Sequence, residues 1–499
     1  MGARRNDIPA QARATAVLEM LSPERCHGAV TRRAQEMGVS RQAIYAMAAK
    51  AQARLEEMLS PGQHGPVAQT ARIDANRVKR MTVVLCECGV SQRGTQKCLS
   101  EGLDVKVSLG WVNQTLSEAE AAARCVNAEW RPQREESLSG DEIYSQGEPN
   151  LLVVGNESLY VYELTRQPDC TAETWGCVLL NYPQCPQFNS DAGVGLAGGA
   201  KLAETMVHQL DWDHILRPMW GQAARCEAQA YDAISAYETR LGLFNRANSS
   251  GRLVQHLKVL DQLESEMMTK IARADAFRSL VEQADAEFGL IERNTGEVRD
   301  PQLAVQRLQT LGQQFKQWSG AIYEKISSYF RNLAAGLFGY VPVLKRALQP
   351  LMDRWGTSGV QALSRLWQCE ADARRHARPV VEQQRLHRVW SACLDAACIA
   401  LGDQLWSAWD ELAALLGKVW RGSSLAECIN SKLRPVFDRR DQTDQGCLEL
   451  FRFLHNTHVF ARGKRAGHSP AQLVLLDVPD DPLTLLGFAP KCQSNLAAF

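Results

Sequence analysis

The feature that most constrains the fold of this 499-residue chain is a single block of strand-forming sequence between helical regions. Short β-prone runs begin at Leu138, Leu151 and Leu159, and turns rich in Gly, Pro and Asn separate them, which predicts a three-stranded antiparallel meander. The block then predicts, in order, a helix over 172–180, a strand entering 190–191, a Gly-rich turn, a helix over 200–206 and a strand over 207–212. With strands confined to this block, we expect an α+β protein of several domains.

The sequence from 214 to about 420 predicts a long all-helical segment. It is rich in Ala, Leu, Gln, Glu and Arg, and its apolar residues recur at helical spacing, as in Leu253, Leu257, Leu260 and Leu263. The elements ahead of it have the order β-β-β-α-β-α-β, which is that of a ribonuclease H-like core. The helical segment is therefore expected to interrupt such a core.

Helices resume after this segment. A Gly-Ser-Ser sequence should cap a helix that ends before Pro435, and a last amphipathic helix should cover 445–460. Residues 451–470 hold four basic residues and no acidic one. The tail after Ser469 is expected to be a loosely packed extension.

The N-terminal end of the chain is basic, because residues 1–80 hold 13 Lys/Arg and 7 Asp/Glu. Helical sequence over 24–37, a Gly-Val-Ser turn at 38–40 and a second helix from Arg41 form a helix-turn-helix pattern. The apolar side chains that should hold these helices together are Ala34, Val39, Ile44 and Met47. The side chains that should face a DNA groove are Arg41, Gln42 and Tyr45.

The same pattern recurs after a Pro/Gly break at 60–66. The second unit consists of a helix over 81–87, another Gly-Val-Ser turn at 89–91, a helix that opens at Gln92 and a long helix from Ser108 to about Glu129. Its candidates for DNA contacts are Gln92, Arg93 and Lys97. Two matched units indicate a tandem DNA reader, and two packed helical hairpins without a ligand are the alternative.

Three acidic residues stand where such a core could hold metal ions: Asp141 in the first strand, Asp191 at the end of the fourth and Glu427 on the helix after the all-helical segment. An acid in a central strand is expensive to bury unless a cation neutralises it. Period-two alternation lets only one of Asp141 and Glu142 face the site, and we choose Asp141, which shares a face with Ile143. Asp191 precedes a flexible Gly-rich turn at a strand's carboxyl end, where open α/β sheets bind ligands.

At these residues the sequence resembles a known family. It is similar to DDE transposases with a ribonuclease H-like core, in particular bacterial insertion-sequence transposases whose core is split by a helical insertion. The segments that carry the resemblance are 139–144, 189–193, 210–214, 424–435, 451–456 and 463–470. Among them, Asp211-x-x-His214 is similar to the Cys/Asp-x-x-His signature of Mutator-like and hAT-like members.

The resemblance implies a DNA transposase that binds terminal inverted repeats and performs strand cleavage and strand transfer with Mg²⁺, or Mn²⁺ as a substitute. Asp141 would bridge two ions, and Asp191 and Glu427 would each hold one. Water would cut the strand at the transposon end, and the freed 3′-OH would then attack target DNA. A homodimer or larger assembly on double-stranded DNA in the bacterial cytoplasm is implied. The expected parts are 1–60 and 61–133 for DNA reading, 134–216 and 421–499 for the core, and 217–420 for the insertion.

Further residues are expected to support this chemistry. Those expected to orient the carboxylates are Asp211, His214, Asn430 and Arg434. Lys464 and Arg465 are expected to contact DNA phosphates, and a merely solvated basic face is the alternative.

The choice of Glu427 depends on the helical segment being an insertion, because 236 positions separate Asp191 from Glu427. Its competitors are Asp410, Glu411 and Glu449, of which Glu411 ranks second because it too lies on a helix ahead of the Gly-Ser-Ser cap.

Other features narrow the function classes. Fifteen cysteines in a chain that starts without an apolar signal predict reduced thiols rather than disulfides. No apolar run approaches the roughly 18 residues of a membrane helix. The glycines of 193–199 fit the letters of the G-x-G-x-x-G dinucleotide-binding pattern. That pattern should follow the first strand of a βαβ unit, whereas here it follows an antiparallel meander, which disfavours a dinucleotide site. Two alternative functions remain: a catalytically inactive transposase-derived DNA-binding protein and a structure-specific DNA nuclease.

Overall fold

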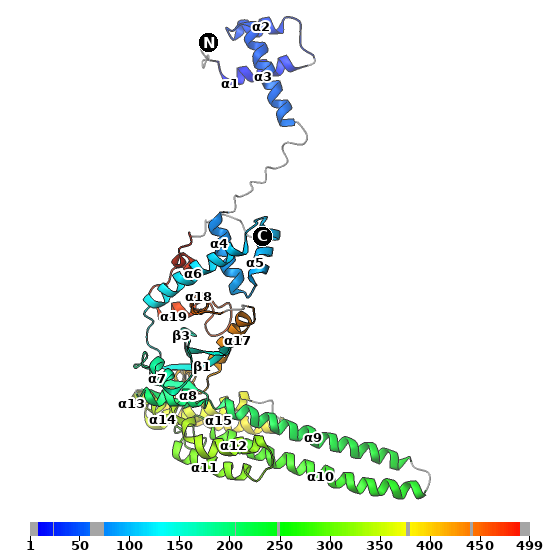
Figure 1. Cartoon of the computed structure of the whole chain (residues 1–499), viewed down its shortest axis with the longest axis vertical. Coiled ribbons are helices and arrows are strands. Elements are labelled where there is room, and N and C mark those ends of the chain that lie inside the picture. The colour runs from blue at the N-terminus through cyan, green and yellow to red at the C-terminus, as the bar shows by residue number, and fades with distance from the viewer. Residues whose placement is uncertain are drawn as a thin grey trace. The chain divides into compact units, whose positions relative to one another are not determined.

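The chain folds into two compact units, Met1–Val78 and Lys79–Phe499. The computed structural model describes residues 8–22, 24–59, 74–204, 206–246, 250–375, 380–439 and 443–489 (Figure 1). It confirms a mixed α+β protein with one sheet in a mainly helical chain.

The N-terminal unit is built from three helices: α1 (Ala10–Leu21), α2 (Ala29–Glu36) and α3 (Arg41–Leu59). Ala34 and Ile44 are buried in its core, and Val39 and Met47 pack against it, which confirms the predicted contacts between the helices. Helix α1, which the sequence reading left out, contributes Ala16 and Met20 to the same core. Helix α2 begins later than position 24 because the left-handed Gly28 (φ +80°) precedes it.

The five strands form one mixed sheet with the order β3-β2-β1-β4-β5. The strands are β1 (Ser137–Ser145), β2 (Glu148–Gly155), β3 (Val161–Arg166), β4 (Gln187–Ser190) and β5 (Val207–Leu210). The pairs β1/β2 and β2/β3 are antiparallel, whereas β1/β4 and β4/β5 are parallel. The predicted meander is confirmed, and β1 lies in the middle of the sheet.

Helices cover both faces of the sheet, and they are α7 (Ala172–Leu179), α8 (Val194–Leu202), α17 (Ser424–Arg439) and α18 (Gln445–Thr457). Residues 151–154 of β2 form a continuous apolar run, Leu-Leu-Val-Val, as expected for a strand buried on both sides. Leu151 and Val153 pack in the core that holds Trp175 of α7. Leu152 and Val154 pack on the other face with Ile429 of α17. Helix α17 therefore returns to the sheet from far along the sequence.

The glycine-rich sequence after Asp191 is helical, so the flexible turn predicted there and the late helix over 200–206 were wrong. A Cβ on Gly195 would lie 1.8 Å from the Cys170 carbonyl oxygen, and one on Gly199 would lie 2.4 Å from the Trp175 Cβ. These glycines let α8 pack closely against α7 and the residues before it. Close packing, and not flexibility, explains the composition of this segment.

The all-helical segment is confirmed in the described residues from 213 to 416, where the only β feature is an isolated bridge between Ile291 and Val298. Its α-helices are α9 (Asp213–Asn245), α10 (Ser250–Glu287), α11 (Pro301–Phe315), α12 (Ala321–Leu333), α13 (Tyr340–Trp355), α14 (Thr357–Arg375), α15 (Val380–Leu401) and α16 (Leu405–Leu416). They share one core with Leu210 at the end of β5. Helices α9 and α10 form a long hairpin that projects from the other helices (Figure 1).

The second predicted DNA-reading unit shares a core with the sheet-bearing body. Its helices are α4 (Ala75–Glu87), α5 (Gln92–Leu103) and α6 (Leu109–Glu129), and Ser108 caps α6 as predicted. Val112 and Leu116 of α6 pack with Phe453 of α18. These helices are thus part of the compact unit that contains the sheet.

Two predictions about the C-terminal region were wrong. Helix α17 continues through Pro435, which is possible because Ser431, whose carbonyl loses an N–H partner, is exposed to solvent. The described part of the tail after Ser469, residues 470–489, is packed and not loose. A capping box formed by Ser469 and Gln472 starts the short helix α19 (Pro470–Val474), and Phe488 is buried against α6 and α18.

Candidate active site

Asp141 lies in the centre of the sheet, on the face that α17 covers. Its Oδ2 accepts a hydrogen bond from the Asn430 side-chain amide at 2.7 Å, and its Oδ1 accepts one from the Glu142 backbone N–H at 2.9 Å. Burial, together with the negative charges of Asp191 and Glu427, raises the pKa of Asp141 to about 6. Two other chain segments, the end of β4 and α17, therefore bring carboxylates close enough to Asp141 for their charges to act on it.

Asp191 directly follows β4, at the carboxyl end of a parallel strand. Its Oδ1 accepts a hydrogen bond from the Gly193 backbone N–H at 2.8 Å, which closes a tight turn before α8. Because β1 and β4 are adjacent and parallel at this point, the end of β4 lies beside the Asp141 segment. The sheet topology thus explains why these two acids meet.

Glu427 lies one turn inside α17 and is partly exposed, at 39% of its side chain. His214 Nδ1 is 3.9 Å from its Oε1, and Arg217 Nη1 is 4.0 Å from its Oε2. Both basic side chains come from the start of α9. The glutamate therefore stands at the junction between the sheet, the all-helical segment and α17.

Asp211 attaches α17 to the end of β5. It is 2% exposed, and its Oδ2 accepts hydrogen bonds from both the backbone N–H and the hydroxyl of Ser423, each at 2.8 Å. Its Oδ1 accepts the Asp213 backbone N–H at 2.8 Å. One ligand atom each of Asp211, His214 and Glu427 lies within 4.8 Å of the others. The hydrogen bonds to Ser423 attach the start of the helix that carries Glu427 to the end of β5.

Glu142 belongs to the candidate site, although the sequence analysis set it aside in favour of Asp141. Burial, together with the charges of Asp191 and Asp141, raises its pKa to about 7. Its buried Oε2 has no hydrogen-bond partner among the described residues. Period-two alternation does put it on the opposite face from Asp141, but Asp191 at the strand end acts on both. The sequence feature that could have pointed to Glu142 is its position directly after Asp141. We refer to Asp141, Glu142, Asp191 and Glu427 as the sheet-edge cluster.

The residue types of the sheet-edge cluster suit a divalent cation, although among the described residues only Asp211, His214 and Glu427 bring ligand atoms within 4.8 Å of one another. Carboxylate oxygens are the ligands that Mg²⁺ prefers. Mutually repelling, partly buried carboxylates are stabilised when a cation neutralises them. Asn430 Oδ1, like Glu142 Oε2, is buried without a hydrogen-bond partner among the described residues. Of the two helix positions predicted to support Glu427, Asn430 contacts Asp141, whereas Arg434 is exposed.

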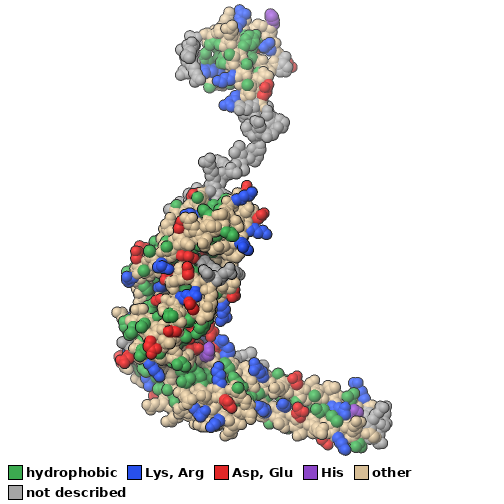
Figure 2. Space-filling model, in the orientation of Figure 1, with side chains coloured by type: hydrophobic (Ala, Val, Ile, Leu, Met, Phe, Trp, Pro, Cys, Tyr) green, Lys and Arg blue, Asp and Glu red, His purple; other side chains and the backbone are tan. Residues whose placement is uncertain are grey.

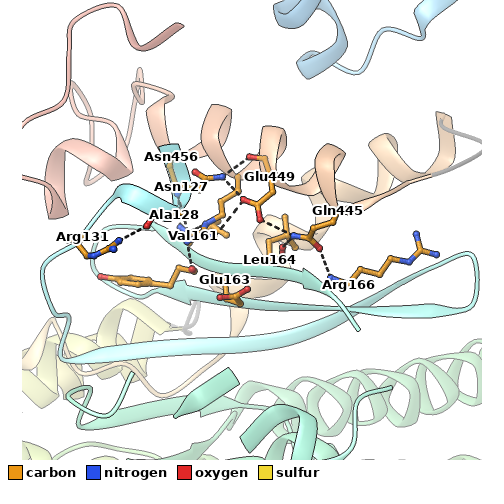
Figure 3. Close-up of polar contacts among 12 residues, drawn as sticks. Asn127, Ala128, Arg131, Val161, Glu163, Leu164, Arg166, Gln445, Glu449 and Asn456 are labelled. Carbon is orange, nitrogen blue, oxygen red and sulfur yellow. Dashed lines mark hydrogen bonds and ion pairs between the residues drawn. The ribbon is translucent and has the colours of Figure 1, made fainter. Parts of the chain in front are cut away.

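Glu449 belongs to a different network, drawn in Figure 3. It lies on α18, where its carboxylate accepts hydrogen bonds from Asn127 Nδ2 at 2.7 Å and from Gln445 Nε2 at 3.1 Å. Arg452 Nη1 is 4.0 Å away. We refer to Asn127, Gln445, Glu449 and Arg452 as the α18 network, which joins α6, α18 and β3.

The other two competitors lie in the all-helical segment. Glu411 binds the guanidinium of Arg354 at 2.8 and 2.9 Å. Asp410, its neighbour on α16, is exposed. Of the four candidates, only Glu427 is among the charges that act on Asp141.

The predicted DNA contacts of the N-terminal unit are exposed. Arg41, Gln42 and Tyr45 lie on the outer side of α3, and Tyr45 is 52% exposed. The opposite side of α3 carries the buried Ile44. The N-terminal helix-turn-helix unit therefore presents a polar face of α3 to solvent.

The predicted contacts of the second unit border a hollow. Gln92 and Arg93 line a hollow of about 800 Å³ together with Asn113 of α6 and Val436 of α17. Gln92 Nε2 donates to Asn113 Oδ1 at 3.3 Å, and Lys97 is exposed. The start of α5 therefore faces a concave surface and not open solvent.

The two basic residues of the C-terminal segment differ in their contacts. Arg465 donates to the backbone carbonyls of Glu157 at 2.6 Å and of Asn156 at 2.8 Å, so it fixes this segment to the β2–β3 turn. Lys464 is exposed, with its Nζ 6.0 Å from the Trp420 ring centroid. A phosphate contact suits Lys464 better than Arg465.

Comparison with known proteins adds no family to this picture: no protein-family model matches the chain, and no significant match was found among curated proteins. Within the described part of the chain, no helix combines the length and the apolar character needed to cross a membrane. The cysteines described are all free thiols.

Proposed function

We propose that this protein is a DNA transposase of the DDE type, which cuts and joins DNA strands at the sheet-edge cluster. The observation that carries the proposal is geometric: the end of β4, which leads into Asp191, lies beside β1, and α17, which carries Glu427, contacts Asp141 through Asn430 at 2.7 Å. Three carboxylates from a central strand, a neighbouring strand end and a distant helix are the donor set that two-metal phosphoryl transfer requires.

The topology supports the same proposal. The order β3-β2-β1-β4-β5, with an antiparallel meander followed by two parallel strands, agrees with a ribonuclease H-like core. The return of α17 to the sheet after the all-helical segment supports a core split by an insertion. The Asp211–Ser423 contact supports it further, because it joins the two parts of the core at the point where the insertion ends.

In this proposal Asp141, Asp191 and Glu427 hold Mg²⁺, which when bound activates the attacking oxygen and stabilises the leaving 3′ oxygen. Asn430 orients Asp141, and Asp211 holds the start of α17 in place. Arg217, 67% exposed beside Glu427, is placed to meet a DNA phosphate. The reaction is an in-line displacement at phosphorus, in which water or a DNA 3′-OH forms the new P–O bond, the P–O3′ bond breaks and no covalent enzyme intermediate forms.

DNA recognition is assigned to the N-terminal unit and to the start of α5. Arg41, Gln42 and Tyr45 would read base edges in a terminal inverted repeat. Two ends must be held together for joining, so the active form would be a homodimer or a larger assembly.

The test uses duplexes taken from the DNA on both sides of the coding region, incubated with the full chain and Mg²⁺ or Mn²⁺. We expect nicking at an inverted repeat and joining of the freed 3′-OH to target plasmid. Asp191→Asn and Glu427→Gln should each lower both reactions by about 10³-fold. Glu411→Gln, the matched control, should leave them unchanged.

Three outcomes would contradict the proposal. Activity retained by Glu427→Gln would remove this residue from the site. Cleavage without joining would favour a structure-specific nuclease. Binding without cleavage under either metal would favour an inactive DNA-binding derivative.

A further inference from the structure

The outer half of the α9–α10 hairpin has almost no core of its own. The core of the all-helical segment reaches Ala230 on α9 and Ala274 on α10. Between these two positions, Leu260 is the only buried apolar residue among those described. The hairpin nevertheless continues to Asn245 and Ser250, so the two helices extend well past the point where other helices cover them (Figure 1).

This outer half exposes a stripe of apolar side chains. Val254, Leu257 and Met268 of α10 are 55%, 46% and 58% exposed. Their spacings of three and eleven residues place them on one side of the helix. Tyr231 of α9 is 71% exposed. Such a stripe on a two-helix hairpin is typical of half of a four-helix bundle.

Charge is sharply segregated along the same stretch. The tip of the hairpin, residues 240–246 and 250–258, holds four Lys/Arg and no acidic residue. The middle of the hairpin, residues 227–238 and 261–269, holds six Asp/Glu and no basic residue. Lys and Arg side chains and a His are visible near the free end in Figure 2. Of the six acids, Glu227 is paired within the hairpin, with Arg278.

The acidic middle also contains a hollow of about 280 Å³ between the two helices. Asp232, Ala233 and Ala236 of α9 line it, together with Leu263, Glu266 and Lys270 of α10. Small alanine side chains leave the space open, and the carboxylates of Asp232 and Glu266 border it together with the ammonium group of Lys270.

We propose that the outer α9–α10 hairpin is a self-association surface, on which a second copy of this chain packs antiparallel to the first. The basic tip of each copy then lies over the acidic middle of the other, and one two-fold axis generates both contacts. Each tip also brings Val254 and Leu257 toward Tyr231 and Met268 of its partner. Two hairpins complete a four-helix bundle, which covers the apolar stripe.

The available area is sufficient for a stable dimer. Twenty residues of helix span about 30 Å, and two adjacent helices are roughly 20 Å wide, so each hairpin offers about 600 Å². Two such faces exceed the about 1,000 Å² that a specific interface needs. DNA suits this surface less well, because the acidic middle would repel phosphates along most of its length.

This inference deepens the proposed function, since it rests on the homodimer proposed above and names the surface that forms it. The test of this surface measures molecular mass only. A negative result would therefore not contradict the proposed strand chemistry, and a lack of strand cleavage would not contradict the proposed dimer.

The test measures the mass of the full chain by sedimentation over a concentration series. A tip variant, Arg246→Glu with Lys258→Glu, should weaken the dimer by about tenfold or more because like charges then face each other. A middle variant, Asp232→Lys with Asp261→Lys, should do the same. Combining all four substitutions in one chain, or mixing the two variant chains, should restore association.

The control is Lys345→Glu, an exposed charge reversal on α13, which should leave the mass unchanged. Circular dichroism of every variant checks that the helices are intact. A monomeric wild type, or tip and middle variants that associate as well as wild type, would overturn the proposal. So would a tip variant that loses DNA affinity at unchanged mass, because the tip would then be a DNA contact.

Discussion

The sheet-edge cluster and the α18 network both contain buried or partly buried acids, but the surroundings of these acids have opposite effects on the charged carboxylate. In the α18 network, two amide donors satisfy Glu449 and a guanidinium lies nearby. In the sheet-edge cluster, burial and neighbouring negative charges raise the pKa values of Asp141 and Glu142. The first arrangement stabilises the folded chain, and the second opposes folding unless a cation binds. This contrast distinguishes an acid whose charge the fold satisfies from acids that we propose to bind a metal ion.

The sharpest way to break the comparison is Asp141→Asn. Strand cleavage should fall by about 10³-fold, because a ligand carboxylate is lost. Stability without metal should instead rise by on the order of 1 kcal/mol, because the raised pKa means that folding disfavours the charged form. Cleavage assays and thermal melts in chelator measure the two effects. Loss of both activity and stability would make Asp141 a structural residue.

Asp211→Ala tests the attachment of α17 to β5. It leaves the Ser423 N–H and hydroxyl buried without their acceptor, and should lower the free energy of unfolding by about 2–3 kcal/mol. Activity should fall as well, because Glu427 is then poorly positioned. Denaturant melts and hydrogen exchange at 424–430 provide the readout. Unchanged exchange in these amides would show that Asp211 does not hold the helix.

The stability of the protein should depend on pH through His455 of α18. Burial lowers the pKa of His455 to about 3, below the ordinary value of 6.5. Its contribution is therefore fully present above pH 6.5 and is lost progressively as the pH falls toward 3, by on the order of 2 kcal/mol at pH 5. His455→Gln should flatten the stability profile over this range. An equally steep profile in the variant would assign the acid sensitivity to other groups.

The smallest expected effect is that of Glu449→Gln. Replacing the charged acceptor in the α18 network should lower stability by about 1 kcal/mol, because charge-assisted hydrogen bonds become neutral ones. Cleavage should be unchanged. Thermal melts and the cleavage assay are compared with those of Asp141→Asn, which should instead raise stability and lower cleavage. A cleavage defect in Glu449→Gln would reopen this residue as a catalytic candidate.

Local sequence predicted much of the fold. The meander, the all-helical segment and the Ser108 cap all follow from short-range periodicity and capping, which depend on neighbours in the sequence. The glycines of α8 were misread as a turn, because the close approach of Cys170 and Trp175 depends on tertiary packing, which the local sequence does not show. The packed tail was missed for the same reason, since Phe488 is buried by helices far from it in sequence.

The candidate site was partly predictable. Residue type and strand position singled out Asp141 and Asp191, and Asp211 was expected to have an orienting role. The coupling of Glu142 to Asp191 was not predictable, because alternation along one strand says nothing about an acid at the end of its neighbour. The contact of Asn430 with Asp141 follows from the packing of α17 on the sheet, which no local pattern encodes.

The most direct measurement is a calorimetric titration of the metal-free chain with Mg²⁺ and with Mn²⁺. We predict binding by the wild type and by Glu449→Gln, and strongly weakened binding by Asp141→Asn, Asp191→Asn and Glu427→Gln. Equal binding by the wild type and Glu427→Gln would contradict the claim that these three carboxylates share a metal site.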